Sequence, residues 1–233
     1  TTTLYACLRM LNTVEVKILT AEDPVEFPVE GIVQCHIVEA QGMTFGKALR
    51  SFLRQDPDII LVGEMRDLET AAIAIEAALT GHLVVSTLHT NSSTEAITRL
   101  VDMGVEPFMI ASSVNGVLAQ RLVKTICPKC PVSAPMTKDQ RDMMQLTEEE
   151  VGGREIQYGT GCDNCNNSGY KGRQGIFEML AMDDEVRELI ATNTPALMLR
   201  QKCIESGMQT LRMDGLRNMF SGVSSFEEVM KYS

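Results

Sequence analysis

The chain has 233 residues, of which 44% are hydrophobic and 22% are charged. These proportions are typical of a folded globular protein, and no apolar run approaches the ~18 residues that a membrane-spanning helix needs. The net charge of −10 has the wrong sign for a protein that binds a phosphate backbone, so we expect no nucleic acid partner. The seven cysteines include two CxxC pairs, which favour a reducing compartment and a metal site over a disulfide framework.

The first 125 residues alternate between predicted strands and predicted helices. Apolar residues at helical spacing predict helices at 4–11, 44–55, 67–80, 93–103 and 107–122. Alternating or continuous apolar runs predict strands at 14–19, 31–38, 59–62 and 83–87. This order predicts an α/β fold with a parallel sheet.

The character of the sequence changes near residue 126. Residues 126–170 hold both CxxC pairs with many Gly and Asn residues, which indicates an inserted, loop-rich module. An extended segment at 172–182 follows, and helices are expected at about 184–193, 195–206, 210–221 and 225–232. We therefore expect three parts, a core at 1–125, a cysteine module at 126–170, and a strand with a helical subdomain at 171–233.

A carboxylate follows the predicted strand Ile59-Ile60-Leu61-Val62, which ends in Gly63-Glu64. Ligands of open α/β sheets bind at the carboxyl ends of the strands. A carboxylate there can polarise an attacking water or help to hold Mg²⁺. The alternative is a core strand with a surface Glu at its end.

Three more carboxylates, Glu22, Asp23 and Glu26, follow the predicted strand that ends at Leu19. Such a cluster can bind Mg²⁺ through water or orient a base. The alternative is a solvated turn, because Asp-Pro is ordinary turn chemistry.

Two histidines flank the predicted strand at 83–87. His82 precedes it and His89 follows it, with Ser and Thr hydroxyls nearby. An imidazole there could donate a hydrogen bond to a terminal phosphate, although a lone His more often has a structural role.

Two arginines, Arg50 and Arg54, stand four residues apart on the predicted helix at 44–55. Residues at this spacing share a helix face, so the pair could clamp phosphate within one subunit or across a subunit boundary. The alternative is a surface helix with ordinary salt bridges.

The two CxxC pairs are Cys127 with Cys130 and Cys162 with Cys165. Two such pairs in a reducing context favour a structural, four-cysteine zinc site, and they can stabilise a loop-rich module. A redox pair is the less favoured alternative, because no thioredoxin-like βαβ pattern surrounds either CxxC.

Together these segments resemble the secretion ATPase superfamily, the hexameric motors that include type II secretion and type IV pilus assembly ATPases. TAEDPVE resembles the Asp box of that family, RQDPDIILVGEMRD its Walker B region, and TGHLVVSTLHTN its His box. NGVLAQRLVKTICPKC leads into a tetracysteine module, and GYKGRQGIFEML resembles the segment that follows. The resemblance covers essentially the whole chain and implies a RecA-like P-loop NTPase core with a zinc insert.

The resemblance also implies cofactors and roles. Glu64 would activate the attacking water, Glu22 and Asp23 would support the Mg²⁺ and water shell with Glu26 nearby, and His82 and His89 would sense the terminal phosphate of ATP. Arg50, Arg54 and Arg173 would reach nucleotide phosphates in the assembled ring. Cys127, Cys130, Cys162 and Cys165 would bind Zn²⁺.

The first residue, Thr1, is similar to the residue that follows the Walker A lysine in this family. We therefore expect a C-terminal segment of a longer ATPase that lacks most of its phosphate loop and binds ATP poorly alone. By resemblance, the function is that of a cytoplasmic motor that drives pilin-like filament assembly for type II secretion. The motor would act through an inner-membrane platform protein. The alternatives are a type IV pilus assembly ATPase or, for this chain alone, a non-catalytic zinc-stapled docking module.

Overall fold

The structure is a computed structural model that describes residues 2–232, and the chain divides into two compact units. The first, which we call the sheet unit, contains the residues up to Gly116 together with Ala181–Arg200. The second, which we call the cysteine unit, contains Val117–Leu180 and the residues from Gln201 onward. The predicted three-part division remains a proposal beside these two units.

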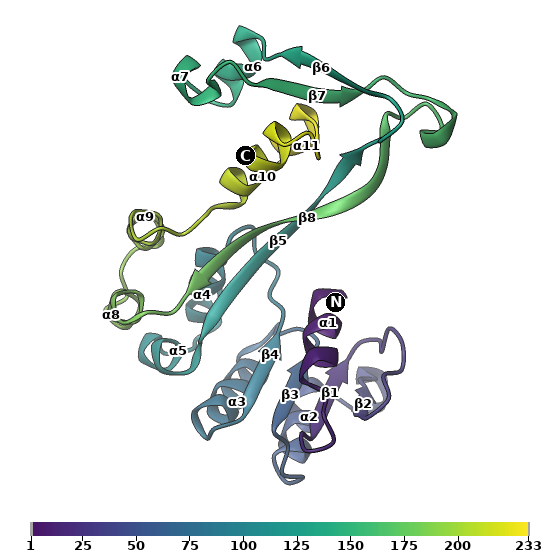
Figure 1. The fold of residues 1–233 in the computed structure, drawn as a ribbon. Helices are drawn as coiled ribbons and strands as arrows, with labels where there is room; N and C mark the ends of the chain where they lie inside the picture. Colours follow the sequence, from purple (N-terminus) through teal and green to yellow (C-terminus); the bar gives the residue numbers. More distant parts are fainter. Residues whose placement is uncertain (1, 233) are drawn as a thin grey trace. The chain divides into compact units, whose positions relative to one another are not determined.

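A four-stranded parallel sheet forms the centre of the sheet unit (Figure 1). The strand order is β2-β1-β3-β4, and every pair is parallel. The strands are β1 (Ile18–Glu22), β2 (Ile32–His36), β3 (Ile59–Val62) and β4 (Leu83–Ser86). All four residues of β3 are buried, as expected for a short apolar strand inside a parallel sheet. The predicted α/β fold with a parallel sheet is confirmed.

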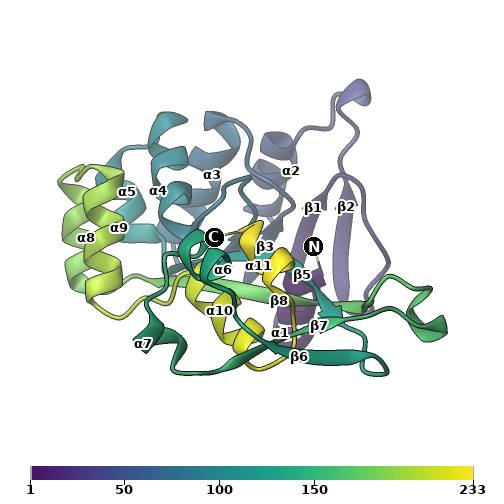
Figure 2. The same ribbon diagram turned by 90° about the horizontal axis from the view of Figure 1, so that it is seen from above.

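Helices cover both faces of this sheet (Figure 2). On one face α1 (Thr2–Leu11) packs Leu8 against β1 and β3. On the other, α2 (Phe45–Phe52) and α3 (Leu68–Leu79) form a larger apolar core with β1 and β3. The side chains of Thr44 and Asp67 accept hydrogen bonds from the backbone of α2 and α3, so each helix begins at a capping residue.

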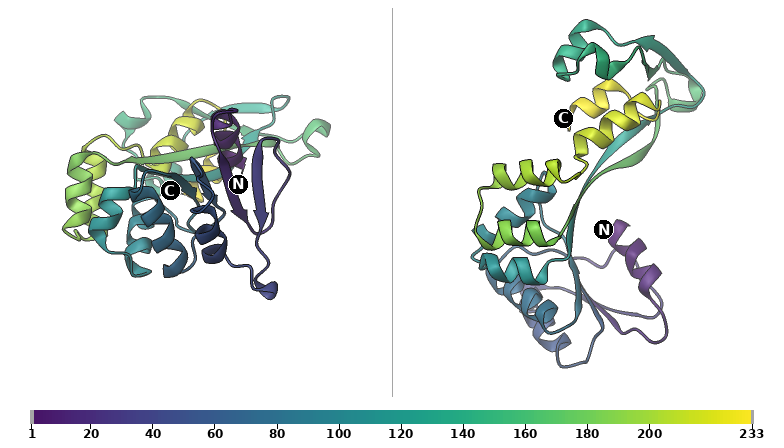
Figure 3. Two further views of the ribbon diagram at one scale, coloured as in Figure 1. Left: turned by 90° about the horizontal axis from the view of Figure 1, so that it is seen from below. Right: turned by 60° about the vertical axis from the view of Figure 1, so that its left-hand side comes forward.

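Three further helices complete the sheet unit. They are α4 (Ser93–Asp102), α5 (Pro107–Ser113) and α8 (Asp184–Ala191), and a short 3-10 helix, η1 (Glu39–Gln41), follows β2. Helix α8 lies against α5 (Figure 3), and the guanidinium of Arg187 donates a hydrogen bond to the carbonyl of Ala111. Residues that follow the cysteine module in sequence therefore return to the sheet unit.

The cysteine unit contains two small sheets. Strands β5 (Gly116–Ile126) and β8 (Tyr170–Ala181) form one, and the antiparallel strands β6 (Pro131–Pro135) and β7 (Glu155–Gly159) form the other. The connecting helices are α6 (Lys138–Met143), α7 (Glu148–Val151) and the short η2 (Asp163–Cys165). The last helices are α10 (Leu211–Phe220) and α11 (Phe226–Met230), and α9 (Ala196–Glu205) crosses the boundary between the units.

One predicted helix is wrong over half its length. Instead of a helix at 107–122, α5 ends at Ser113 and β5 begins at Gly116. In β5 the side chains of Ala119 and Val123 are buried. Residues four positions apart lie on the same face of a strand as well as of a helix, so their spacing fits both. The pairing with β8, a segment distant in sequence, decides between the two.

None of the helices formed by residues 2–232 combines the length and the apolar character that crossing a membrane requires.

Candidate functional site

The carboxyl ends of three neighbouring strands meet at one edge of the sheet. Glu22 is the last residue of β1, Gly63 and Glu64 follow β3, and Thr87 follows β4. The backbone N–H of Gly63 donates to the Ala21 carbonyl at 2.8 Å. A Cβ on Gly63 would lie 3.2 Å from that carbonyl oxygen, so glycine permits this close approach.

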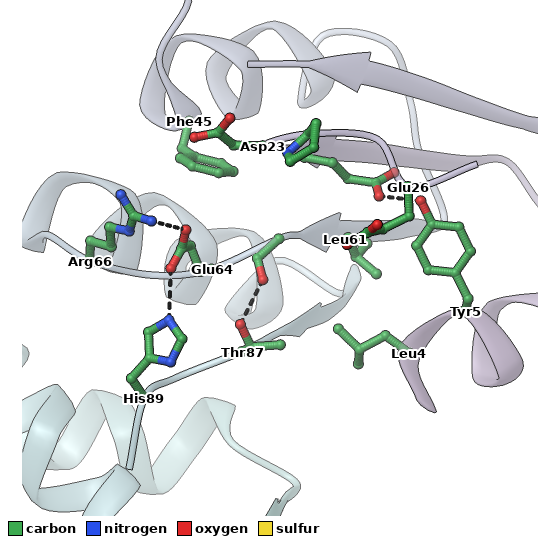
Figure 4. A pocket seen from close by; sticks show the side chains of 13 residues that line it. Leu4, Tyr5, Asp23, Glu26, Phe45, Leu61, Glu64, Arg66, Thr87 and His89 are labelled. Carbon is green, nitrogen blue, oxygen red and sulfur yellow. Dashed lines mark hydrogen bonds and ion pairs between the residues drawn. The ribbon is translucent and has the colours of Figure 1, made fainter. Parts of the chain in front are cut away.

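A pocket of about 210 Å³ opens at this edge (Figure 4). It lies wholly within the sheet unit, where ligands of open α/β sheets bind. Four carboxylates, one guanidinium and one imidazole line it together with apolar side chains from α1 and α2. The lining residues are Leu4, Tyr5, Glu22, Asp23, Pro24, Glu26, Phe45, Leu61, Gly63, Glu64, Arg66, Thr87 and His89.

Glu64 lies between two basic side chains (Figure 4). One carboxylate oxygen forms an ion pair with the guanidinium of Arg66, and the other lies 3.1 Å from Nε2 of His89. The hydrogen bond from Arg66 lowers the pKa of Glu64, against the opposing effect of burial, and His89 lowers that pKa further. The carboxylate is therefore ionised at neutral pH and is able to accept a proton.

Glu22 is held by neutral donors. Its side chain is 4% exposed, and its Oε2 accepts a hydrogen bond from the hydroxyl of Tyr5. Its Oε1 accepts from Thr20 Oγ1 at 2.6 Å and from Gln34 Nε2 at 3.1 Å. Burial raises the pKa of Tyr5, and Glu22 raises it further. These hydrogen bonds offset the cost of burying the Glu22 carboxylate.

Asp23 and Glu26 are exposed carboxylates that line the same pocket. Oxygen donors of this kind are the ligands that Mg²⁺ prefers, usually with several waters retained. Glu22, Asp23, Glu26 and Glu64 therefore form one set of oxygen donors from the ends of two adjacent strands.

The two predicted histidines are separated. His89 lines the pocket, whereas His82 precedes β4 at the opposite edge of the sheet. His82 Nδ1 lies 3.0 Å from the Ala77 carbonyl and 3.2 Å from Thr80 Oγ1. His82 thus contacts polar groups at the end of α3, outside the pocket.

The predicted arginines do not line the pocket. Arg50 is exposed and pairs with Glu69 of α3 at 2.5 Å, and Arg54 is exposed in the turn after α2. Arg173 is exposed on β8 and belongs to the cysteine unit. The remaining nucleotide-site prediction, Thr1, lies outside the described residues.

Sequence reasoning missed three polar residues of the pocket, namely Tyr5, Arg66 and Thr87. Arg66 follows Glu64 by two residues and could have been found as the nearest counter-charge. Thr87 donates a hydrogen bond to the Gly63 carbonyl at 2.7 Å, and Tyr5 stands among apolar residues of an amphipathic helix. Neither of these two carries a local signal that separates it from a structural residue.

The four paired cysteines gather into one cluster in the cysteine unit. The sulfur atoms of Cys127, Cys130, Cys162 and Cys165 all lie within 4.8 Å of one another. Cys127 and Cys162 are 3.8 Å apart, as are Cys162 and Cys165, and Cys130 and Cys165 are 3.9 Å apart. A disulfide needs about 2.05 Å, whereas four sulfurs around one zinc ion at about 2.3 Å stand about 3.8 Å apart. These three sulfur–sulfur distances therefore match those of a tetrahedral thiolate site.

Polar groups surround these sulfurs. Asn164 Nδ2 donates to Cys127 Sγ at 3.3 Å, and the Gly169 N–H donates to Cys165 Sγ at 3.3 Å. The hydrogen bond from Asn164 lowers the pKa of Cys127 to about 6, whereas burial raises the pKa of Cys130 to about 11. Donors to sulfur of this kind favour the thiolate form that metals bind.

Comparison with known proteins gives consistent matches. A family model described as "Type II/IV secretion system protein" matches residues 1–231. The type II secretion system ATPase E of Vibrio cholerae is 50% identical over 99% of this chain and 45% of its own length. The type IV pilus assembly ATPase PilB of Thermus thermophilus is 47% identical over 98% of this chain and 26% of its own length. The chain thus spans less than half the length of these two relatives.

Solved structures agree with the fold. The pilus retraction motor PilT, solved with bound ADP, matches with a TM-score of 0.71 at 28% identity, over 99% of this chain and 57% of its own. The Legionella pneumophila ATPase DotB matches with a TM-score of 0.69 at 26% identity, over 98% of this chain and 55% of its own.

Proposed function

We propose that this chain, which belongs to the type II/IV secretion system protein family, forms the hydrolytic part of an ATP-driven secretion motor. The observation that carries the proposal is the position of Glu64. It is an ionised carboxylate at the end of a central strand, beside His89 and across a pocket from three further carboxylates. A candidate base, a candidate hydrogen-bond donor and candidate oxygen ligands for a metal therefore line the same pocket.

The proposed reaction is attack of water on the terminal phosphorus of ATP. Glu64 takes the proton of the water while the new P–O bond forms and the bond to the bridging oxygen breaks, which releases ADP and phosphate. Bound Mg²⁺ would neutralise charge on the phosphates. The carboxylates of Glu22, Asp23 and Glu26 would hold its water shell, and His89 would donate a hydrogen bond to the terminal phosphate.

The size of the pocket supports this arrangement. Complete ligand pockets usually measure about 300–1,000 Å³, so a space of about 210 Å³ suits the phosphate end of a nucleotide rather than the whole molecule. We assign the remaining contacts to Arg50, Arg54, Arg173 and Thr1, which would approach the nucleotide in an assembled ring. Such a ring is closed and heterologous, because each site takes residues from a neighbour.

The cysteine cluster is proposed as a structural Zn²⁺ site. Cys127, Cys130, Cys162 and Cys165 would fill all four positions of a tetrahedron, and a closed site leaves no position for a substrate. Zinc would link the two CxxC loops of this module.

The names of the relatives support a proposal for the biological setting. We propose a cytoplasmic motor that acts on an inner-membrane platform protein and drives assembly of a pilin-like filament for type II secretion. Type IV pilus assembly is the second candidate, because the PilB relative is 47% identical against 50% for the secretion ATPase. Complementation of strains that lack one or the other motor distinguishes the two.

The experiment compares Glu64→Gln with the wild type in the whole gene product that contains residues 1–233. Gln keeps the shape but cannot accept a proton, so we expect kcat to fall about 10²–10⁴-fold while ATP binding stays within about twofold. The matched control is Glu205→Gln, which removes an exposed, ion-paired carboxylate on α9. Near wild-type hydrolysis by Glu64→Gln would refute the assignment. A wild type that hydrolyses no ATP, with contact to a platform protein retained, would favour the docking role.

A further inference from the structure

Glu22 is the most buried acidic residue of the pocket, and no ion pair offsets its charge. It is 4% exposed, and among residues 2–232 no Lys, Arg or His forms an ion pair with it. A buried carboxylate is expensive unless donors or a cation compensate it. In this chain three neutral side chains from three different elements provide the compensation.

The acceptor capacity of Glu22 is nearly used up. A carboxylate oxygen has about two lone-pair sites. Oε1 accepts from both Thr20 and Gln34, whereas Oε2 accepts, among residues 2–232, from the Tyr5 hydroxyl alone. One further position therefore remains, and it is on Oε2.

Gln34 is fixed in turn by the loop around it. Its Oε1 accepts from the Val29 N–H at 2.7 Å, and its Nε2 lies 3.2 Å from the Phe27 carbonyl. The same Nε2 lies 3.1 Å from the Tyr5 hydroxyl oxygen. The amide therefore orients the phenol as well as the carboxylate, and the loop between β1 and β2 holds the amide.

Tyr5 is rigidly placed by its ring. The side chain is 3% exposed, and its ring lies 4.5 Å from that of Phe27 between centroids. It enters the pocket from α1, and its hydroxyl forms the hydrogen bond drawn in Figure 4. A rigid ring that carries one donor can fix the direction of a carboxylate at little cost in entropy.

We propose that Tyr5 is a positioning residue, oriented by Gln34, which holds Glu22 so that its remaining Oε2 position serves a water bound to Mg²⁺. Glu22 then supports the metal through that water. This inference rests on the proposed function, because it concerns the Mg²⁺ of the same site. Outer-shell partners of this kind typically account for 10–100-fold in metal affinity.

The test measures, by calorimetry on the whole gene product, how the binding of a non-hydrolysable ATP analogue depends on the Mg²⁺ concentration. Tyr5→Phe keeps the ring and removes only the hydroxyl. We expect the Mg²⁺ concentration for half-maximal binding to rise about 10-fold, with binding of the analogue in EDTA unchanged within twofold. Gln34→Leu should shift the titration in the same direction. Tyr158→Phe, on β7 of the cysteine unit, is the matched control and should leave the titration unchanged.

The outcomes separate the two claims. A wild-type Mg²⁺ titration in Tyr5→Phe would overturn the positioning role while leaving the hydrolytic assignment intact. Weaker binding in EDTA as well as in Mg²⁺ would also overturn it, because that pattern reports a general packing defect. A wild-type protein that binds no analogue at any Mg²⁺ concentration would overturn the proposed function, and this inference with it.

Discussion

The two units of the molecule each gather four ligand groups, but they do so in opposite ways. In the sheet unit, carboxylates from two adjacent strands line an open pocket, and Oε2 of Glu22 keeps one free position among residues 2–232. In the cysteine unit, four thiols from two CxxC loops face one another within 4.8 Å. Oxygen donors with free positions suit a hard cation that exchanges water and substrate, whereas a closed sulfur set suits a permanent metal. The chemistry of the ligand groups thus distinguishes the candidate catalytic site in the sheet unit from the candidate structural metal site in the cysteine unit.

The largest effect is expected from the removal of one sulfur ligand in the cysteine unit. Cys162→Ser should abolish stoichiometric zinc in metal analysis. It should also remove the cooperative unfolding of the cysteine unit, because structural zinc is worth about 10–16 kcal/mol in small modules. Nucleotide binding at the pocket should stay within about twofold. Cys7→Ser, at an exposed cysteine of α1, is the control and should retain zinc. Loss of nucleotide binding in step with zinc would show that the sulfur site is not purely structural.

A smaller effect is expected from substitution of the two histidines that flank β4, and it should differ between them. His89→Ala removes a donor beside Glu64 and should lower kcat about 100-fold in a steady-state ATPase assay. His82→Ala removes only the contacts at the end of α3. It should lower the unfolding free energy by about 1 kcal/mol and leave kcat within about twofold. Equal losses of kcat in both variants would contradict the division of roles.

The smallest effect concerns the ionisation of Glu64. The Arg66 hydrogen bond lowers its pKa below the usual value of 4.5, so the ion pair stabilises the fold above the pKa of the unfolded chain. That contribution is lost as the pH falls through the lowered pKa of the folded state. Carboxyl NMR should show the midpoint of Glu64 below 4.5 in the wild type and higher in Arg66→Gln. The titration midpoint of Glu205, whose pKa is lowered by Lys202 in the other unit, should not change in Arg66→Gln. An unchanged midpoint of Glu64 in this variant would show that Arg66 does not lower its pKa.

Local hydrophobic patterns predicted most elements of the sheet unit, because flanking Pro, Gly or capping residues marked where those elements begin and end. The apolar run Ile59–Val62 fits a buried strand between Pro57 and Gly63, and the helix at 68–79 begins at the capping residue Asp67. The segment 114–122 lacked such boundaries. Its apolar residues fit both a helix and a strand, and only pairing with β8 resolves them.

The acidic residues of the candidate site were predictable because they stand next to strand ends in the sequence. Glu22, Asp23 and Glu64 stand directly at strand ends, and parallel strands necessarily bring those ends to one edge. Tyr5 and Gln34 were not predictable, because their role depends on a hydrogen bond across three elements. His82 illustrates the reverse case, since a residue close to the site in sequence lies at the far end of its strand.

The return of α8 to the sheet unit has a consequence for synthesis on the ribosome. The carbonyl of Ala111 in α5 accepts a hydrogen bond from Arg187, and the carbonyl of Asn115 accepts one from the N–H of Met182. The pocket is encoded entirely before residue 90, so its residues leave the exit tunnel long before these partners. The unit that carries the carboxylates therefore completes its packing only after the whole cysteine module has been translated.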